Sequence, residues 1–219
     1  MESLRIIRVT GKGQFKLTPD VTRVTMTLSG VKVEYAEALA LSSADTETLK
    51  SVLKPFGFES ADVKTLAFSV DAEYESYRER DEWKQRFVGY RYEHVCKIEF
   101  DSDNERLGKI LYALAHAAIQ PELSFSYTVK DPEAAKNLLL HKAVEDAAAK
   151  AAVLAKASGV TLREIQSIDY SRRTIEFEAA PVRRLEKCAD TAEERSFGMD
   201  IQPDDIEVSD TVTIVWEIA

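Results

Sequence analysis

The stretch DPEAAKNLLLHKAVEDAAAKAAVLAKASG, residues 131–159, decides the fold. Asp131 suits the N-cap position, Pro132 the first helical position and Glu133 the first turn, while Gly159 suits the left-handed C-cap. The stretch therefore predicts one long helix. Its expected buried face is rich in small side chains, which let a helix lie close against a sheet: Leu140, Val144, Ala147, Ala151, Leu154 and Ala155.

Strand-like segments lie far from this helix in the sequence, near both ends of the chain. Residues 4–9, 164–170 and 206–218 have strand character, and the last segment alternates apolar and polar residues. We predict that residues 1–20 together with 131–219 form one α+β unit that contains the long helix and the C-terminal strands.

The middle of the chain, residues 21–130, reads strand, helix, strand, strand, helix, strand, which is the order of the ferredoxin-like βαββαβ unit. In its second strand we expect Leu66, Phe68 and Val70 to point inward. The fold class predicted is thus α+β, with two sandwich-like subdomains, in which the ferredoxin-like unit is an insertion into the other.

A short glycine-containing stretch, VTGKGQFKLTPD at residues 9–20, raises the alternative of a phosphate site. A phosphate cradle needs a glycine-rich loop that leads into a helix, whereas here the glycines lead into another strand. We therefore interpret Gly11, Gly13, Pro19 and Asp20 as the corner of a hairpin connection.

Composition and charge limit the classes of partner. The net charge of −9 repels nucleic acid and anionic lipid, and no apolar run approaches the length of about 20 residues that spans a bilayer. Residues 1–10 do not resemble a secretory signal, so we expect a cytoplasmic protein. Two cysteines cannot build a disulfide framework.

No group of residues predicts a catalytic, cofactor-binding or metal site. His94, His116 and His141 lack the spacing of metal ligands, and His94 has the parity of a core or interface residue. Cys96 shares that parity and is expected to be inert. Cys188 is the candidate redox-sensitive residue, because the neighbouring Arg183, Arg184 and Lys187 favour a thiolate. It stands in the long charged segment 177–205, which we interpret as a mobile or partner-binding segment.

Aromatic residues gather around the charged hairpin between the second and third strands of the middle unit. Exposed aromatic side chains on a strand pair can anchor a partner subunit. The candidate interface residues are Tyr74, Tyr77, Trp83, Phe87 and Tyr90.

Five segments resemble the SIMPL-domain family (domain of unknown function 541), and the likeness covers essentially the whole chain. They are RVTGKGQFKLTPDVTRVTMTLSG (8–30), VGYRYEHVCKIEF (88–100), LGKILYALAHAAI (107–119), FSYTVKDPEAAKNLLLHKAVEDAAAKAAVLAKASGV (125–160) and VSDTVTIVWEI (208–218). Bacterial members of that family are mostly periplasmic or associated with the outer membrane. The resemblance implies a two-part α+β fold, a tendency to self-associate and a link to tolerance of oxidative stress, and it implies no catalytic residues.

Three functions are compatible with these observations. The first is a non-enzymatic homo-oligomer of the SIMPL type, joined through edge strands and the aromatic hairpin. The second is a small-molecule-binding module, which rests on fold analogy. The third is a thiol-dependent peroxide-handling protein centred on Cys188.

Overall fold

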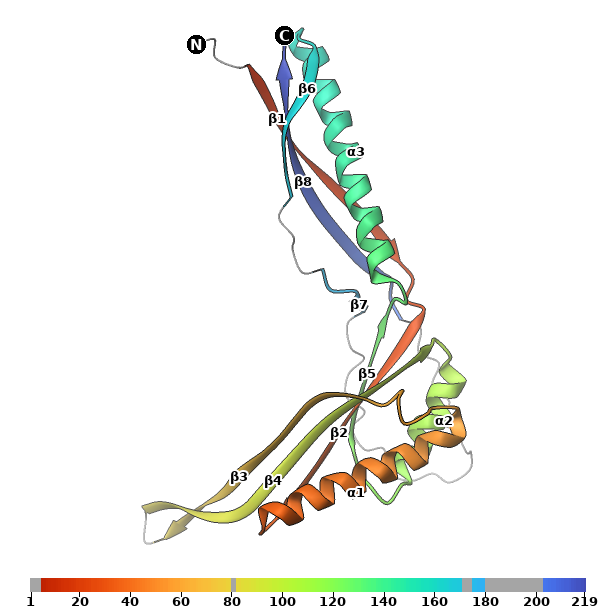
Figure 1. Ribbon diagram of the computed structural model, residues 1–219, viewed down its shortest axis with the longest axis vertical. Coiled ribbons are helices and arrows are strands. Elements are labelled where there is room, and N and C mark those ends of the chain that lie inside the picture. Colours follow the sequence, from red (N-terminus) through yellow and green to blue (C-terminus); the bar gives the residue numbers. More distant parts are fainter. Residues whose placement is uncertain (1–4, 80–81, 171–174, 180–202) are drawn as a thin grey trace. The chain divides into compact units, whose positions relative to one another are not determined.

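The computed structural model describes residues 5–79, 82–170, 175–179 and 203–219 (Figure 1). Within these residues the fold is mixed α/β, with three α-helices and two sheets whose strand pairs are antiparallel. The chain divides into two compact units, one built from Met1–Pro19, Thr128–Ala179 and Pro203–Ala219, and the other containing Asp20–Tyr127.

The first unit is a three-stranded sheet with one long helix. Its strand order is β1-β8-β6, and β1 pairs with β8 along its whole length, from Ile6 with Glu217 to Leu17 with Ile206. The elements are β1 (Ile6–Leu17), α3 (Pro132–Ser158), β6 (Leu162–Asp169) and β8 (Ile206–Ile218).

Helix α3 is closed at both ends by its own residues. The Asp131 carboxylate accepts a hydrogen bond from the Ala134 amide at 2.8 Å, and Gly159 adopts the left-handed conformation with φ of 67°. These groups satisfy amides and carbonyls that a helix leaves without intrahelical partners.

Gly11 and Gly13 lie inside strand β1, so the interpretation of these glycines as a hairpin corner is wrong. Both face α3: a Cβ built on Gly11 would stand 2.0 Å from the carbonyl oxygen of Ala143, and one on Gly13 would stand 2.0 Å from that of Leu139. Any side chain at either position would hold helix and strand apart. The chain turns later, between Leu17 and the start of β2 at Val21.

The buried face of α3 repeats every four residues. Two residues along a strand advance about 6.7 Å, and four residues along a helix advance about 6 Å. Alternate residues of β1 therefore meet every fourth residue of α3, and small side chains fill the narrow space between them. The buried set is Ala135, Leu139, Ala143, Ala147, Ala151 and Ala155.

The expected stripe on this helix was accordingly only half right. Ala147, Ala151 and Ala155 are buried, but Val144 is 37% exposed and Leu154 is 46% exposed. A pattern of period 3.6 places all six on one side, whereas the strand beneath α3 selects period four. The resulting core joins Val9, Val212, Ile214 and Trp216 to the alanines of α3.

The second unit places helices against a larger sheet. The sheet order is β3-β4-β2-β5-β7, in which the two-residue strand β7 (Glu178–Ala179) is counted with the first unit in the division given above. The elements are β2 (Val21–Lys32), α1 (Tyr35–Leu53), η1 (Lys54–Phe56), β3 (Lys64–Glu79), β4 (Glu82–Asp101), α2 (Asn104–Ala115) and β5 (Glu122–Thr128).

The core of this unit lies under α1 and α2, which contact each other. Val24, Met26 and Leu28 of β2 are almost completely buried, as the alternation in that strand predicts. One face of β4, which pairs with β2, and the apolar stripe of α2 are buried as well: Tyr92, Cys96, Ile98, Leu107, Ile110, Leu111 and Leu114.

Strand β3 is the edge of the sheet, and α1 packs mainly on its neighbours β2 and β4. Leu66 is 53% exposed and Phe68 is 49% exposed, so the expectation that both point into a core is wrong. Leu66 lies at a register shift between Thr65 and Ala67, which interrupts the alternation of the strand. Phe68 lies opposite His94 on the core face, but no helix of the described residues covers it at this edge.

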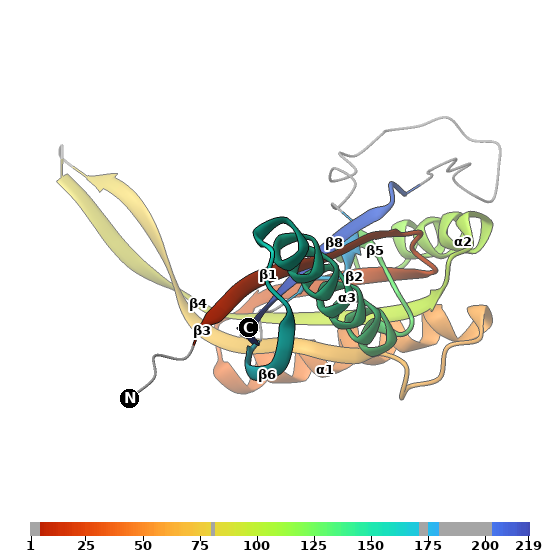
Figure 2. The same ribbon diagram turned by 90° about the horizontal axis from the view of Figure 1, so that it is seen from above.

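Beyond the N-terminal end of α1, β3 and β4 continue as a two-stranded ribbon (Figure 2). We call this ribbon the arm, and define it as Ala72–Glu79 of β3 with Glu82–Tyr90 of β4, the two strands pairing from Ala72 with Tyr90 to Glu79 with Glu82. Because α1 begins at Tyr35, beside Tyr90, no helix among the described residues of this unit covers the arm.

Candidate functional site

Four aromatic rings form a continuous row from the start of α1 onto the arm. The ring centroids of Tyr35 and Tyr90 lie 5.4 Å apart, those of Tyr90 and Phe87 5.3 Å, and those of Phe87 and Tyr74 5.7 Å. Each pair meets edge to face, the arrangement that aromatic quadrupoles favour. We call this row the aromatic ladder.

The ladder is a surface feature. Tyr74 is 57% exposed, Tyr35 49% and Phe87 45%, while Tyr90 is half-buried between its neighbours. The face of the arm that carries the ladder, the ladder face, is the face that α1 covers further along the sheet. The arm thus presents an extension of the core face to solvent.

Cross-strand pairing identifies the other residues of the ladder face. Beyond the pair Tyr74 and Phe87, Ser76 lies opposite Gln85, and Arg78 lies opposite Trp83. Trp83 is 75% exposed, the largest exposed fraction of any large hydrophobic side chain in the described part of the chain.

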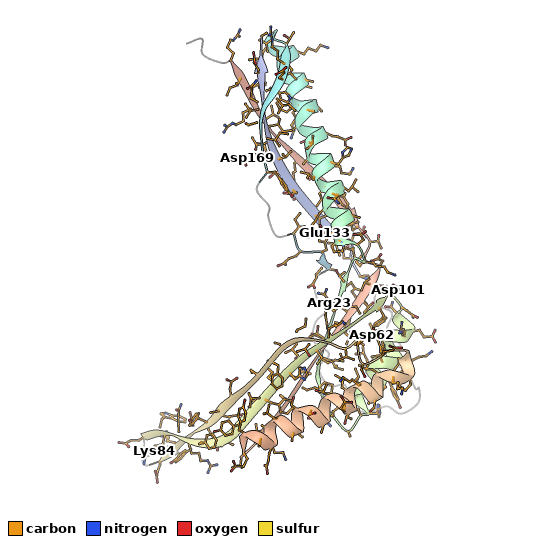
Figure 3. All side chains as sticks on the ribbon, in the orientation of Figure 1. Arg23, Asp62, Lys84, Asp101, Glu133 and Asp169 are labelled. Carbon is orange, nitrogen blue, oxygen red and sulfur yellow. The ribbon has the colours of Figure 1, made fainter. Side chains whose placement is uncertain are left out.

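The opposite face of the arm is charged. Arg86 pairs with Glu75 at 2.7 Å, and Lys84, labelled near the tip in Figure 3, pairs with Glu79 at 2.6 Å. All four side chains are about half exposed or more, so these pairs add little stability but keep this face hydrated. The arm is therefore an amphipathic ribbon with one aromatic and one charged face.

The predicted interface residues divide between these two faces. The structure brings Tyr74, Phe87 and Tyr90 together in the ladder and places Trp83 on the same face. Tyr77 lies on the charged face, where it is paired with Lys84 and 38% exposed. Sequence reasoning missed Tyr35, because it belongs to a helix far away in the chain.

Gly89 was also missed, and it marks the base of the arm. Its φ is 156°, and a Cβ there would stand 2.4 Å from the carbonyl oxygen of Lys32 in β2. The pairing of β3 with β4 shifts register beside it, between Glu73 and Tyr74. A glycine within a strand pattern is the usual signal of such a bulge and close backbone approach.

His94 links three elements of the second unit. The Thr46 hydroxyl donates to the Ser42 carbonyl at 2.8 Å, so it accepts from Nδ1 of His94 at 3.0 Å. Nε2 of the same neutral ring then accepts from the Thr65 hydroxyl at 2.9 Å. Burial lowers the pKa of His94, and the positive charge of Lys50 lowers it further. The residue is half-buried and joins β4 to α1 and β3.

The two cysteines stand differently in the structure. Cys96 is 1% exposed, and burial raises the pKa of its thiol, which opposes formation of the reactive thiolate. Cys188, the candidate redox-sensitive residue, lies outside the described residues, as does most of the segment 177–205.

Two further features of the described residues concern ion binding. No group of three or more His, Cys, Asp or Glu side chains there is placed to hold a metal ion. A shallow cleft of about 160 Å³ is lined by Asp62, Lys64, Lys97 and Glu99. The Glu99 carboxylate in this cleft forms ion pairs with Lys97 at 2.8 Å and Arg23 at 2.7 Å. These side chains therefore neutralise one another and do not point to a bound ion.

No helix among the described residues combines the length and apolar character needed to cross a membrane. No curated protein sequence matches the chain. The family model SIMPL, described as a protein of unknown function (DUF541), matches residues 7–216 of the 219. That match takes in every strand and helix of both units apart from the first residue of β1 and the last two residues of β8, and the chain therefore belongs to the SIMPL family.

Proposed function

We propose that this SIMPL protein is non-enzymatic and self-associates, and that the ladder face of the arm joins its copies. The observation that carries the proposal is the exposed aromatic ladder continuing to Trp83 on a ribbon that no helix covers. Contiguous exposed aromatic surface of this kind is typical of protein interfaces.

The physical cost of leaving the arm bare supports this proposal. An isolated two-stranded ribbon is at best marginally stable in water, and here one of its two faces carries the rings of Tyr74, Phe87, Tyr90 and Trp83. Because Phe87 is 45% exposed, covering it against a partner contributes about half of the roughly 1.5–3 kcal/mol that full burial of an exposed side chain gives. An interface thus offers stabilisation that the arm does not obtain within its own chain.

The arrangement of the second unit suits such a role. We infer that it is ferredoxin-like, because the chain order β2, α1, β3, β4, α2, β5 is combined with the sheet order β3-β4-β2-β5. In that arrangement β3 is an open edge, and its exposed Leu66 and Phe68 extend the apolar surface of the arm.

The remaining parts of the functional hypothesis rest on the sequence. A link to oxidative-stress tolerance is implied by the family resemblance, and the cytoplasmic location stays a prediction. The alternatives, a small-molecule-binding module and a peroxide-handling thiol protein, also stay predictions; the residue that the second of them needs, Cys188, lies outside the described residues.

Light scattering with mass determination tests the proposal. The wild-type chain is expected to show a multiple of the 24.6 kDa protomer mass, and Trp83→Ala is expected to raise the dissociation constant at least about tenfold. Tyr77→Ala, on the charged face, is the matched control and should leave the mass unchanged. A wild-type chain that stays a protomer at high concentration contradicts the proposal.

A further inference from the structure

We propose that two copies of this chain pair arm to arm, with the arms antiparallel and the ladder faces in contact. The two-fold axis lies between the two faces and runs across the strands, along the line that joins Ser76 to Gln85. This inference rests on the proposed self-association and adds its symmetry and register. A second copy is the occupant because the residues of the ladder face are complementary to themselves.

The complementarity follows from the spacing of the residues along the arm. The ladder face reads Tyr74, Ser76, Arg78 on β3 and Phe87, Gln85, Trp83 on β4. A two-fold axis across the ribbon reverses its direction but keeps β3 over β3 and β4 over β4. With the axis at Ser76 and Gln85, each end residue lies two positions from the axis and meets its counterpart at the other end.

Two contacts result, and the symmetry makes each of them twice. Arg78 lies over the ring of the partner's Tyr74, which suits a cation–π contact. Trp83 lies over the ring of the partner's Phe87, which suits aromatic packing. The most exposed ring of the described chain is thereby covered by a ring that is itself 45% exposed.

The polar residues of the arm agree with this register. Gln85 meets its symmetry mate at the axis, where two side-chain amides can donate to and accept from each other. The ion pairs Arg86 with Glu75 and Lys84 with Glu79 lie on the opposite face and stay hydrated. None of the six residues Tyr74, Ser76, Arg78, Trp83, Gln85 and Phe87 carries a carboxylate, so on these residues the pairing has no carboxylate to desolvate.

Helix α1 excludes the alternative of parallel arms. Facing sheets pack about 10 Å apart, and a helix with its side chains is about 10–12 Å wide. Parallel arms would bring two copies of α1, both on the ladder-face side, into a space that holds neither. In the antiparallel pair the partner's strands end at Glu79 and Glu82, over Glu73 and Val88 by residue count, before Tyr90 and the start of α1.

Thiol cross-linking tests the register. In a Cys188→Ser background, where the remaining Cys96 is buried, Ser76→Cys and Gln85→Cys are each treated with a short bifunctional thiol reagent. Each variant alone is expected to give covalent dimers. Glu75→Cys, one residue away on the charged face, is the matched control and is expected to give at least about tenfold less.

A mixture of the two variants separates the two symmetries. The antiparallel register predicts mostly Ser76→Cys with Ser76→Cys and Gln85→Cys with Gln85→Cys products, whereas parallel arms put Ser76 over the partner's Gln85 and predict mostly mixed products. Mixed products, or equal cross-linking of Glu75→Cys, in a sample that light scattering shows to be dimeric would overturn this register and leave self-association standing. A sample that is monomeric at all concentrations would overturn both.

Discussion

Gly11 of β1 lies directly against Ala143 of α3, with no room between strand and helix for a single methyl group. A Cβ on Gly11 would stand 2.0 Å from the Ala143 carbonyl oxygen and 2.4 Å from the Ala147 amide nitrogen, and both are backbone atoms that cannot rotate away. Gly11 and Gly13 are therefore packing residues. The helix that packs against them, α3, is the longest element of the first unit.

Gly11→Ala is expected to destabilise the protein by about 1–3 kcal/mol or more, because helix and strand must separate to admit the methyl group. Urea denaturation followed by circular dichroism measures the change. Gln14→Ala, on an exposed position of the same strand, is the control and should stay within about 0.5 kcal/mol of the wild type. Equal stability of Gly11→Ala and the wild type would contradict the close approach.

Asp131→Ala is expected to cost about 1 kcal/mol, because the Ala134 amide loses the side-chain acceptor that caps α3. Asp131→Asn keeps an oxygen at that position and should recover most of the loss. Thermal unfolding of the three proteins checks the order. The cap has no such role if the alanine and asparagine variants unfold at the same temperature.

His94 is expected to make the protein less stable as the pH falls. Burial and Lys50 hold its pKa in the folded state below the ordinary value of 6.5, so the unfolded chain binds the proton more readily. The free energy of unfolding therefore decreases as the pH falls from that value toward the lower pKa of the folded state. Urea titrations at about pH 7.5 and about pH 5 measure this decrease.

The matched variant for that experiment is His94→Gln, which removes the titrating ring but keeps a polar side chain between Thr46 and Thr65. Its loss of stability over the same pH interval should be smaller than that of the wild type, since only the titratable groups that both proteins share then contribute. An identical loss in the two proteins would show that His94 does not contribute.

Added salt is expected to strengthen self-association. Each copy carries a net charge of −9, so two copies repel each other, and the proposed contact buries aromatic rings without an ion pair across it. Raising sodium chloride from about 0.05 M to about 0.5 M screens the repulsion. Sedimentation equilibrium should show a lower dissociation constant at high salt; a higher one would indicate that ion pairs between copies hold the assembly.

Prediction from the sequence succeeded where the alternation of apolar and polar residues within a strand was enough to identify its buried face. The strand expected at residues 206–218 is confirmed as β8, and Val24, Met26 and Leu28 are buried as expected. Prediction failed where the burial of a strand residue depends on whether another element of the fold covers it. Phe68 has the parity of the core face of β3, but whether it is covered depends on how far α1 reaches across the sheet, which no residue in β3 encodes. At Leu66 a register shift interrupts the alternation that the sequence pattern assumes.

The candidate interface shows the same limit. The aromatic residues were identified as a group from their density in the sequence, but their division between two faces depends on the bulge beside Gly89. Strict alternation through β4 would place Phe87 and Tyr90 on opposite faces, because it takes no account of the bulge. The part played by Tyr35 required the contact between the start of α1 and Tyr90, which is a property of the folded unit.

The four-residue repeat of α3 makes the helix respond unequally to changes in its length. One residue inserted between Ala143 and Ala147 would turn the rest of the helix by about 100° and bring Asp146, Lys150 and Leu154 to the positions of Ala147, Ala151 and Ala155. One residue deleted there would instead bring Ala148, Ala152 and Lys156. Because Ala148 and Ala152 follow Ala147 and Ala151, a helix shorter by one residue would still place alanine at two of the three buried positions. A helix longer by one residue would instead place Asp146 and Lys150, which form an ion pair, against the sheet.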